Sequence, residues 1–166
     1  MAKRIDPKTV PAQVGTFYPP PYDQPCRARE RRKLGDAAGL TQFGINLLRL
    51  APGVWSSQRH WHTGQDEFVY VLAGEVVLVT NAGEELLKPG DCAGFKAGDK
   101  DGHHLQNRSD SDALLLEIGT RLSNDSGEYP DIDLAFKMGG PTMYTRKDGT
   151  PYTDIKLREP NNEKRR

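Results

Sequence analysis

All four histidines of the chain lie in two short clusters, and their spacing suits a metal site. One residue separates His60 from His62, whereas His103 and His104 are adjacent. Residues two apart in a β-strand point to the same face, so His60 and His62 would project together. Glu67 follows a short turn and would open the next strand. Two imidazoles and a carboxylate from adjacent strands form a mixed nitrogen and oxygen site, which suits Fe, Mn, Ni, Cu, Co or Zn.

A divalent ion held in this way keeps coordination positions open for water or substrate. It acts as a Lewis acid on a carbonyl or hydroxyl group, or lowers the pKa of bound water. The expected substrates are small, oxygen-rich chelating molecules such as sugars, hydroxy- or keto-acids and catechol-like compounds. Apart from His104, no histidine is left for proton transfer, which would fall to metal-bound hydroxide, Glu67, a tyrosine or another carboxylate. The sequence assigns no catalytic residue.

Strand alternation also predicts the walls of the pocket around such a site. Gln58 shares the parity of His60 and would be a polar group that binds substrate. Leu105 shares the parity of His103, and Phe95 should face inward as well. Leu105 and Phe95 would then be apolar walls of the substrate pocket, although residues of these types more often serve packing alone.

These residues belong to a segment that reads as β-structure. Between Thr41 and Thr120, short apolar runs rich in β-branched and aromatic residues alternate with Gly, Pro, Asn and Asp. The runs predict strands at Phe43–Leu50, Glu67–Ala73, Glu75–Thr80, Glu84–Leu87, Asp91–Phe95, His103–Asn107 and Leu114–Gly119. Asn81-Ala82-Gly83 predicts a hairpin turn. Closely spaced strands without a helical period indicate an all-β sandwich or barrel.

The flanks of this segment differ from it in composition. Residues 1–38 are expected to form an extended arm, because six of the twelve prolines fall between Pro7 and Pro25 and exclude a regular helix. Residues 39–121 would be the barrel. Residues 122–166 are polar and rich in Gly and Pro, and they predict an irregular C-terminal extension that packs on the barrel and frays at its end.

Charge and composition limit the possible partners. Of the 166 residues, 23 are Lys or Arg and 23 are Asp or Glu, so no positive field favours nucleic acid. The run Arg27–Lys33 holds five basic residues and could contact an anion or RNA, but zero net charge favours a solvated run or pairing with acidic residues. The longest apolar stretch, Phe68–Val79, is interrupted by Gly74 and Glu75, so no membrane span is expected.

Two further expectations concern the compartment and the assembly. The N-terminus lacks the apolar region of a secretory signal, and Cys26 and Cys92 lie in no metal or redox spacing, so two reduced thiols in the cytoplasm are expected.

The strand after Glu67 is apolar on both faces, because Phe68, Tyr70 and Leu72 oppose its inward residues. An antiparallel sheet with one wet face should alternate instead, so we expect a homodimer packed through this sheet.

The spacing of glycines around the histidines resembles the two motifs of the cupin superfamily. The residues that carry the first motif are Gly53, His60, His62, Glu67 and Gly74, and those of the second are Gly90, Gly98, His103 and Asn107. Lys96 stands where the second motif usually has proline. Four residues separate Gly98 from the histidine pair where two are usual, which leaves His103 and His104 as alternatives. His103 keeps the usual spacing to Asn107 and is preferred.

The stretch Leu40–Thr120 is similar to small bacterial single-domain cupins. This resemblance implies a double-stranded β-helix, or jelly-roll barrel, with one divalent transition metal ion held by His60, His62, Glu67 and His103. It implies a small metalloenzyme with sugar-phosphate-isomerase-like or dioxygenase-like chemistry, and the sequence does not separate the two. The alternative is a non-catalytic module that binds or senses a small ligand, since the fold alone does not determine function.

Overall fold

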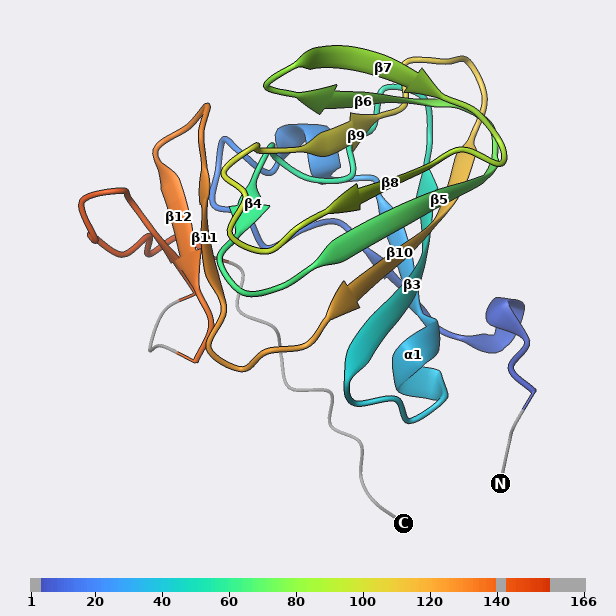
Figure 1. The fold of residues 1–166 in the computed structure, drawn as a ribbon, viewed down its shortest axis with the longest axis horizontal. Helices are drawn as coiled ribbons and strands as arrows, with labels where there is room; N and C mark the ends of the chain where they lie inside the picture. Colours follow the sequence, from blue (N-terminus) through green and yellow to red (C-terminus); the bar gives the residue numbers. More distant parts are fainter. Residues whose placement is uncertain (1–3, 140–142, 156–166) are drawn as a thin grey trace.

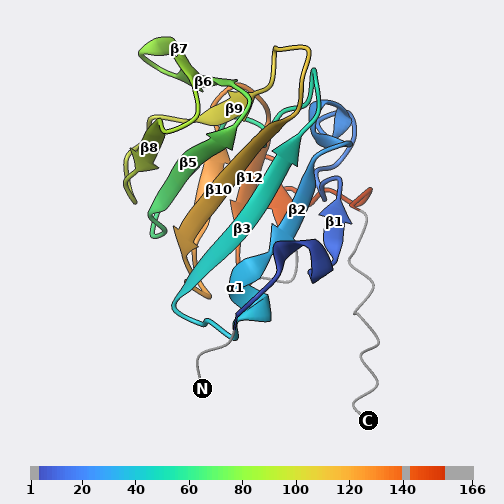
Figure 2. The same cartoon turned by 90° about the vertical axis from the view of Figure 1, so that its right-hand side faces the viewer.

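Two layers of antiparallel strands face each other in the computed structural model, which describes residues 4–139 and 143–155 (Figure 1). The first layer is a six-stranded sheet. Its strands lie side by side in the order β1 (Ala12–Val14), β2 (Glu30–Lys33), β3 (Phe43–Leu50), β10 (Ala113–Thr120), β5 (Glu67–Ala73) and β8 (Cys92–Phe95) (Figure 2). All five pairings between these strands are antiparallel.

The second layer consists of two smaller sheets. One has the order β7 (Gly83–Leu87), β6 (Val76–Thr80) and β9 (His104–Gln106), and the other has the order β13 (Tyr144–Thr145), β12 (Leu134–Lys137), β11 (Ser126–Tyr129) and β4 (Trp61–His62). Isolated bridges join Trp55 to Gln106 and His60 to His103. Residues 55–62 therefore run beside both sheets and connect them, which completes the all-β, double-sheet architecture expected for a jelly roll.

The central strands follow the predicted pattern closely. All seven predicted strands are present; two have the predicted ends, and the ends of the others differ by no more than one residue. Thr80 pairs with Gly83 at the end of the β6–β7 hairpin, which confirms the turn predicted at Asn81-Ala82-Gly83. The alternation along β5 is also as expected, because Val69 and Val71 are buried whereas Phe68 is exposed.

The N-terminal segment contributes strands to the barrel wall. Its helical pieces are short, namely η1 (Pro7–Thr9), η2 (Gln24–Cys26) and α1 (Leu34–Ala37). β2 pairs with β3 over its whole length, so this part of the predicted extended arm lies within the six-stranded sheet. No helix among the described residues is long and apolar enough to cross a membrane.

The C-terminal segment packs on the barrel through its own strands. β11 pairs with β4, and β12 and β13 continue the sheet outward. A second apolar cluster joins this sheet to the N-terminal segment, with members Tyr18, Cys26, Tyr129, Leu134, Phe136 and Tyr144. The frayed end expected for the last residues lies outside the described residues.

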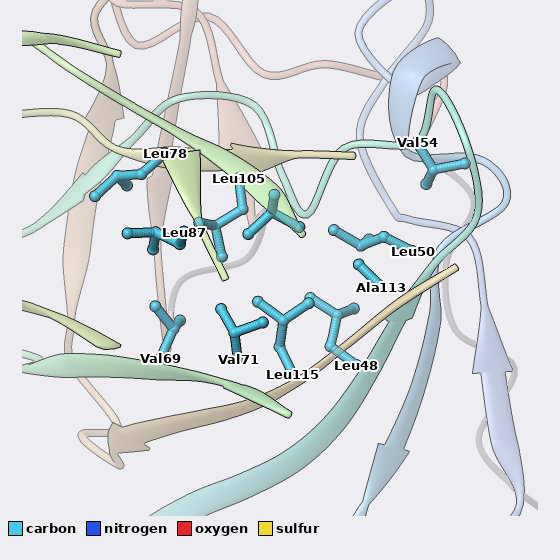
Figure 3. Packing of buried hydrophobic residues seen from close by; sticks show 11 residues of the cluster. Leu48, Leu50, Val54, Val69, Val71, Leu78, Leu87, Leu105, Ala113 and Leu115 are labelled. Carbon is cyan, nitrogen blue, oxygen red and sulfur yellow. The ribbon is translucent and has the colours of Figure 1, made fainter. Parts of the chain in front are cut away.

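The main core fills the space between the two layers (Figure 3). Leu48, Val71 and Leu115 point inward from the six-stranded sheet and are fully buried. They face Leu87 and Leu105, which come from the smaller layer. Truncating one of these leucines to alanine removes about 2–5 kcal/mol of stability. The core occupies one end of the barrel, and the polar residues described next occupy the other.

Candidate metal centre

Three imidazoles converge on one carboxylate oxygen inside the barrel. Oε2 of Glu67 lies 3.1 Å from Nε2 of His103, 3.2 Å from Nε2 of His62 and 3.6 Å from Nε2 of His60. The potential ligand atoms of His60, His62 and Glu67 all lie within 4.8 Å of one another. Four donors that face a common point from the two layers are the arrangement a transition metal ion requires.

The two layers supply different parts of this cluster. His60 and His103 face each other across an isolated bridge, in which His60 N donates to His103 O at 3.2 Å and His103 N donates back at 2.9 Å. His62 follows in β4 of the same layer. Glu67 is the first residue of β5, in the opposite layer. The imidazoles therefore belong to one wall of the barrel, and the carboxylate reaches them across its interior.

Hydrogen bonds on the far side of two rings fix which nitrogen faces the centre. Nδ1 of His60 donates to the Gln58 carbonyl at 3.0 Å, and Nδ1 of His62 donates to Oδ2 of Asp125 at 2.5 Å. Because a carbonyl and a carboxylate only accept, both rings carry a proton on Nδ1. Nε2 of each ring then faces the shared centre, as in metal-bound histidines. Despite burial, Glu67 and Asp125 raise the pKa of His62 to about 9, so a metal ion would displace the Nε2 proton of this ring.

Asp125 is a buried carboxylate that the sequence analysis missed. It also accepts a hydrogen bond from the Gly64 backbone N–H at 2.8 Å and one from Oγ1 of Thr63 at 3.3 Å. It lies between β10 and β11, in the polar C-terminal segment, where no spacing relative to the histidines points to it. Only the pairing of β11 with β4 brings it beside His62.

A glycine allows β11 to approach β4 closely enough for this contact. Gly127 lies opposite His62 in the register, and a Cβ atom at Gly127 would lie 1.9 Å from the Trp61 carbonyl oxygen. Any side chain there would push the strands apart. The register of β11, and with it the position of Asp125, therefore depends on the absence of a side chain at residue 127.

Two members of the cluster are held in the protonation state that a metal requires. Burial lowers the pKa of His60 to about 3, so its imidazole is neutral at pH 7. Burial favours the neutral form of Glu67, but hydrogen bonds from His103 and His62 hold the pKa of Glu67 well below its usual range. A neutral imidazole and an ionised carboxylate are the donor forms of these side chains. The residues present therefore fit a divalent transition metal ion.

His103 and His104 point to different surroundings. The His103 ring stacks on Phe95, with centroids 3.5 Å apart, and its Nε2 faces Glu67. Nδ1 of His104 donates to the Ser57 carbonyl at 3.0 Å, and its Nε2 lies 2.8 Å from Nε2 of Gln106. Both ring nitrogens of His104 are engaged away from the centre, so His103 is the histidine that completes the cluster.

A cavity of about 610 Å³ opens beside this centre. Of the predicted substrate-binding residues, Phe95 and Leu105 line it. Gln58 is not among the lining residues, because its amide donates to the Tyr22 carbonyl at 2.7 Å. Residues 56–59 form a series of bends, so strand alternation does not carry over from His60 to Gln58.

The far wall of the cavity is polar, which the sequence analysis did not anticipate. Arg31, Lys33, Asn46 and Glu117 all line it. Nε and Nη2 of Arg31 donate to the Glu117 carboxylate at 2.6 and 2.8 Å. The basic run thus pairs in part with acidic residues, as favoured above. Arg31 and Lys33 face inward because side chains alternate along a strand. All four residues of β2 are charged, so the sequence shows no polar and apolar alternation that would predict this direction.

Comparisons with known proteins agree with this architecture. A family model for the cupin domain matches residues 46–119. The chain is 44% identical to a crystal structure described as a sugar phosphate isomerase of the cupin superfamily from Silicibacter pomeroyi DSS-3. The match covers 91% of this chain and 97% of that chain, with a TM-score of 0.87.

More distant structures give a similar picture. A putative sugar phosphate isomerase from Acidithiobacillus ferrooxidans is 30% identical, with a TM-score of 0.68 and coverage of 80% of this chain and 82% of that chain. A polyketide cyclase from Streptomyces resistomycificus shares the fold at 20% identity and a TM-score of 0.59, covering 72% of this chain and 80% of that chain. A search of curated proteins found no significant match.

Proposed function

This chain belongs to the cupin superfamily, and on that premise we propose that it is a metal-dependent enzyme acting on a small, oxygen-rich substrate. One divalent ion among Fe, Mn, Ni, Zn, Co and Cu would be held by His60, His62, Glu67 and His103. The observation that carries the proposal is the convergence of three Nε2 atoms on Oε2 of Glu67 beside an open cavity. When bound, such an ion supplies Lewis-acid chemistry.

Among possible reactions, we favour an isomerisation of the sugar phosphate type. The relative at 44% identity is described as a sugar phosphate isomerase, and the one at 30% identity as a putative sugar phosphate isomerase. The protein's own residues would bind and orient the substrate. The Glu67 side chain is 31% exposed, so the centre is open toward the cavity, and Phe95 and Leu105 exclude water from one side.

A dioxygenase is the second candidate, since three imidazoles and one carboxylate also suit Fe(II) with open positions. Turnover of a panel of sugar phosphates under anaerobic conditions, lost in His60→Ala, is the expected result for the isomerase. Oxygen consumption with Fe(II) and a substrate would instead identify the protein as a dioxygenase. Tight ligand binding without turnover under any metal would favour a non-catalytic sensory module and overturn both.

We also propose that two copies pair through the outer face of the six-stranded sheet. Phe68, Tyr70 and Leu72 are 38–40% exposed on this face of β5. Light scattering at micromolar concentration should show a dimer, and Tyr70→Lys should shift it to monomer. Leu86→Lys, at an exposed apolar residue on β7, is the matched control and should leave the dimer intact. A monomeric native protein would refute this pairing.

A further inference from the structure

The polar wall of the cavity carries two cations on the inward side of one strand. In β2, Arg31 pairs with Leu48 and Lys33 with Asn46 across the β2–β3 register. Leu48 is fully buried in the core, so its cross-strand partner Arg31 is on the inner face, and Lys33, two residues on, shares that face. Both side chains line the same cavity as His60 and Glu67.

Glu117 holds the Arg31 guanidinium in one orientation. The Glu117 carboxylate accepts hydrogen bonds from Nε and Nη2 of Arg31. These are two of the three nitrogen atoms that carry the five N–H donors of an arginine. Within the described part of the chain, the guanidinium makes no further hydrogen bond, so the Nη1 donors remain for a ligand. A guanidinium fixed in this way loses little side-chain entropy when it binds an anion, and its planar fork suits phosphate or carboxylate oxygens.

Two glycines keep the floor of the cavity open between the cations and the metal centre. On the inner face of the sheet, Gly44 pairs with Gly119, and Gly119 pairs with Glu67. A Cβ atom at Gly119 would lie 3.6 Å from Cγ of Glu67, so any longer side chain would occupy space beside the metal ligand. Glu117 lies one inward position further along β10 and is about 7 Å along the strand from Gly119. One small molecule can therefore contact both ends.

The charges of the lining favour a doubly charged anion. The lining residues include three cations (Arg31, Lys33 and Arg121) and three carboxylates (Asp36, Glu67 and Glu117). These six side chains sum to no net charge, and one divalent ion makes the lining doubly positive. A phosphate monoester carries close to two negative charges at pH 7, whereas a carboxylate carries one.

Building on the proposed function, we infer that Arg31 and Lys33 form an anion subsite that receives the phosphate group of the substrate, while its hydroxyl or carbonyl oxygens reach the metal centre. The subsite explains why a strand of four charged residues lines the interior of a barrel. It assigns the substrate to the phosphate monoesters. One end of the cavity would bind the phosphate group, and the other end would bind the hydroxyl or carbonyl oxygens.

Inorganic phosphate is the probe for this subsite, with acetate as the singly charged comparison. Isothermal titration of the Mn²⁺-loaded and the metal-free protein should show phosphate binding at least tenfold tighter than acetate binding in the loaded form. Lys33→Met should weaken phosphate binding about tenfold in both forms, because one charge-assisted hydrogen bond to the anion is lost. Lys88→Met removes the same charge from an exposed residue outside the cavity lining and should change nothing.

Arg31 is replaced together with Glu117, because replacing Arg31 alone would leave the Glu117 carboxylate as an unpaired charge. The double variant Arg31→Gln/Glu117→Gln should also lose about tenfold in phosphate affinity. Metal content is measured in every variant, so that loss of phosphate binding with full metal content supports the subsite. Unchanged phosphate affinity in both variants would overturn it. The wild-type protein could fail to bind metal while its phosphate binding still depends on Lys33. That result would overturn the proposed function but support the subsite.

Discussion

Oδ2 of Asp125 lies 2.5 Å from Nδ1 of His62, on the opposite side of the ring from the Nε2 atom that faces Glu67. The contact joins a residue of the C-terminal segment to the candidate metal centre of the barrel. A carboxylate behind a histidine ligand fixes the ring and increases the electron density on the ligating nitrogen. The C-terminal segment therefore contributes to the site directly, through a residue that would not touch the metal.

Replacing Asp125 with asparagine should weaken metal binding while the ligands remain. The amide keeps the size of the side chain but removes the charge that holds the Nδ1 proton of His62, so the metal affinity should fall about 10–100-fold. Competition with a chromophoric chelator measures the affinity, and circular dichroism checks the fold. Asp148→Asn, at an exposed residue whose carboxylate accepts a hydrogen bond from the Thr150 N–H in the same turn, is the control. Equal affinities for a folded Asp125→Asn and the wild type would contradict a positioning role.

The two adjacent histidines should respond differently to alanine substitution. His103→Ala removes a donor that lies 3.1 Å from Oε2 of Glu67 and should reduce metal content well below one ion per chain. His104→Ala should retain the metal but lose about 1–3 kcal/mol of stability, because its bonds to the Ser57 carbonyl and Gln106 are lost. Elemental analysis and denaturant unfolding measure the two effects. Full metal content in His103→Ala would show that the wrong histidine had been assigned.

The parts of this fold that the sequence predicts are those in which a short repeat determines the structure. β5 alternates between buried and exposed residues, and His60 and His62 share a face for the same reason. His103 follows from its spacing to Asn107. That amide donates to the Leu50 and Ser111 carbonyls at 2.7 Å and fixes the loop after β9.

The remaining features depend on contacts between segments that are distant in sequence. β2 consists of four charged residues and lacks any apolar alternation, and Arg31 pairs with Glu117 of β10 on the inner face of the same sheet, across β3. Asp125 reaches His62 only after β11 pairs with β4. Gln58 precedes His60 by two residues, but the chain bends between them, so the alternation that placed the histidines does not apply.

Metal removal should lower the thermal stability of the wild type but not of a ligand variant. An ion that binds only the folded state at 100 times its Kd adds about 2.7 kcal/mol, which for a chain of this length raises Tm by roughly 5–10 °C. Differential scanning calorimetry with and without a chelator measures the shift. His60→Ala should show no shift, since the centre then lacks a donor. A chelator-sensitive Tm in that variant would place the stabilising metal elsewhere.

The two cysteines should differ in their reactivity toward a disulfide reagent. Cys26 is fully buried, and this burial raises the pKa of its thiol to about 11, so only roughly one molecule in a thousand carries the reactive thiolate at pH 8. Cys92 is exposed and lies opposite Tyr70 in the β5–β8 register, on the face proposed to pair two copies. At pH 8 we expect one thiol per chain to react in the dilute native protein and two in urea.

The same assay tests the pairing of copies in a second way. Cys92 should react more slowly as the protein concentration rises through the dimerisation range, because a partner that covers Tyr70 also covers its cross-strand neighbour. In Tyr70→Lys the reaction rate should no longer depend on concentration. Cys92→Ser, which leaves only Cys26, should show almost no reaction until the chain unfolds. Rapid labelling of Cys26 in the folded Cys92→Ser protein would contradict its burial between the N-terminal segment and the C-terminal sheet.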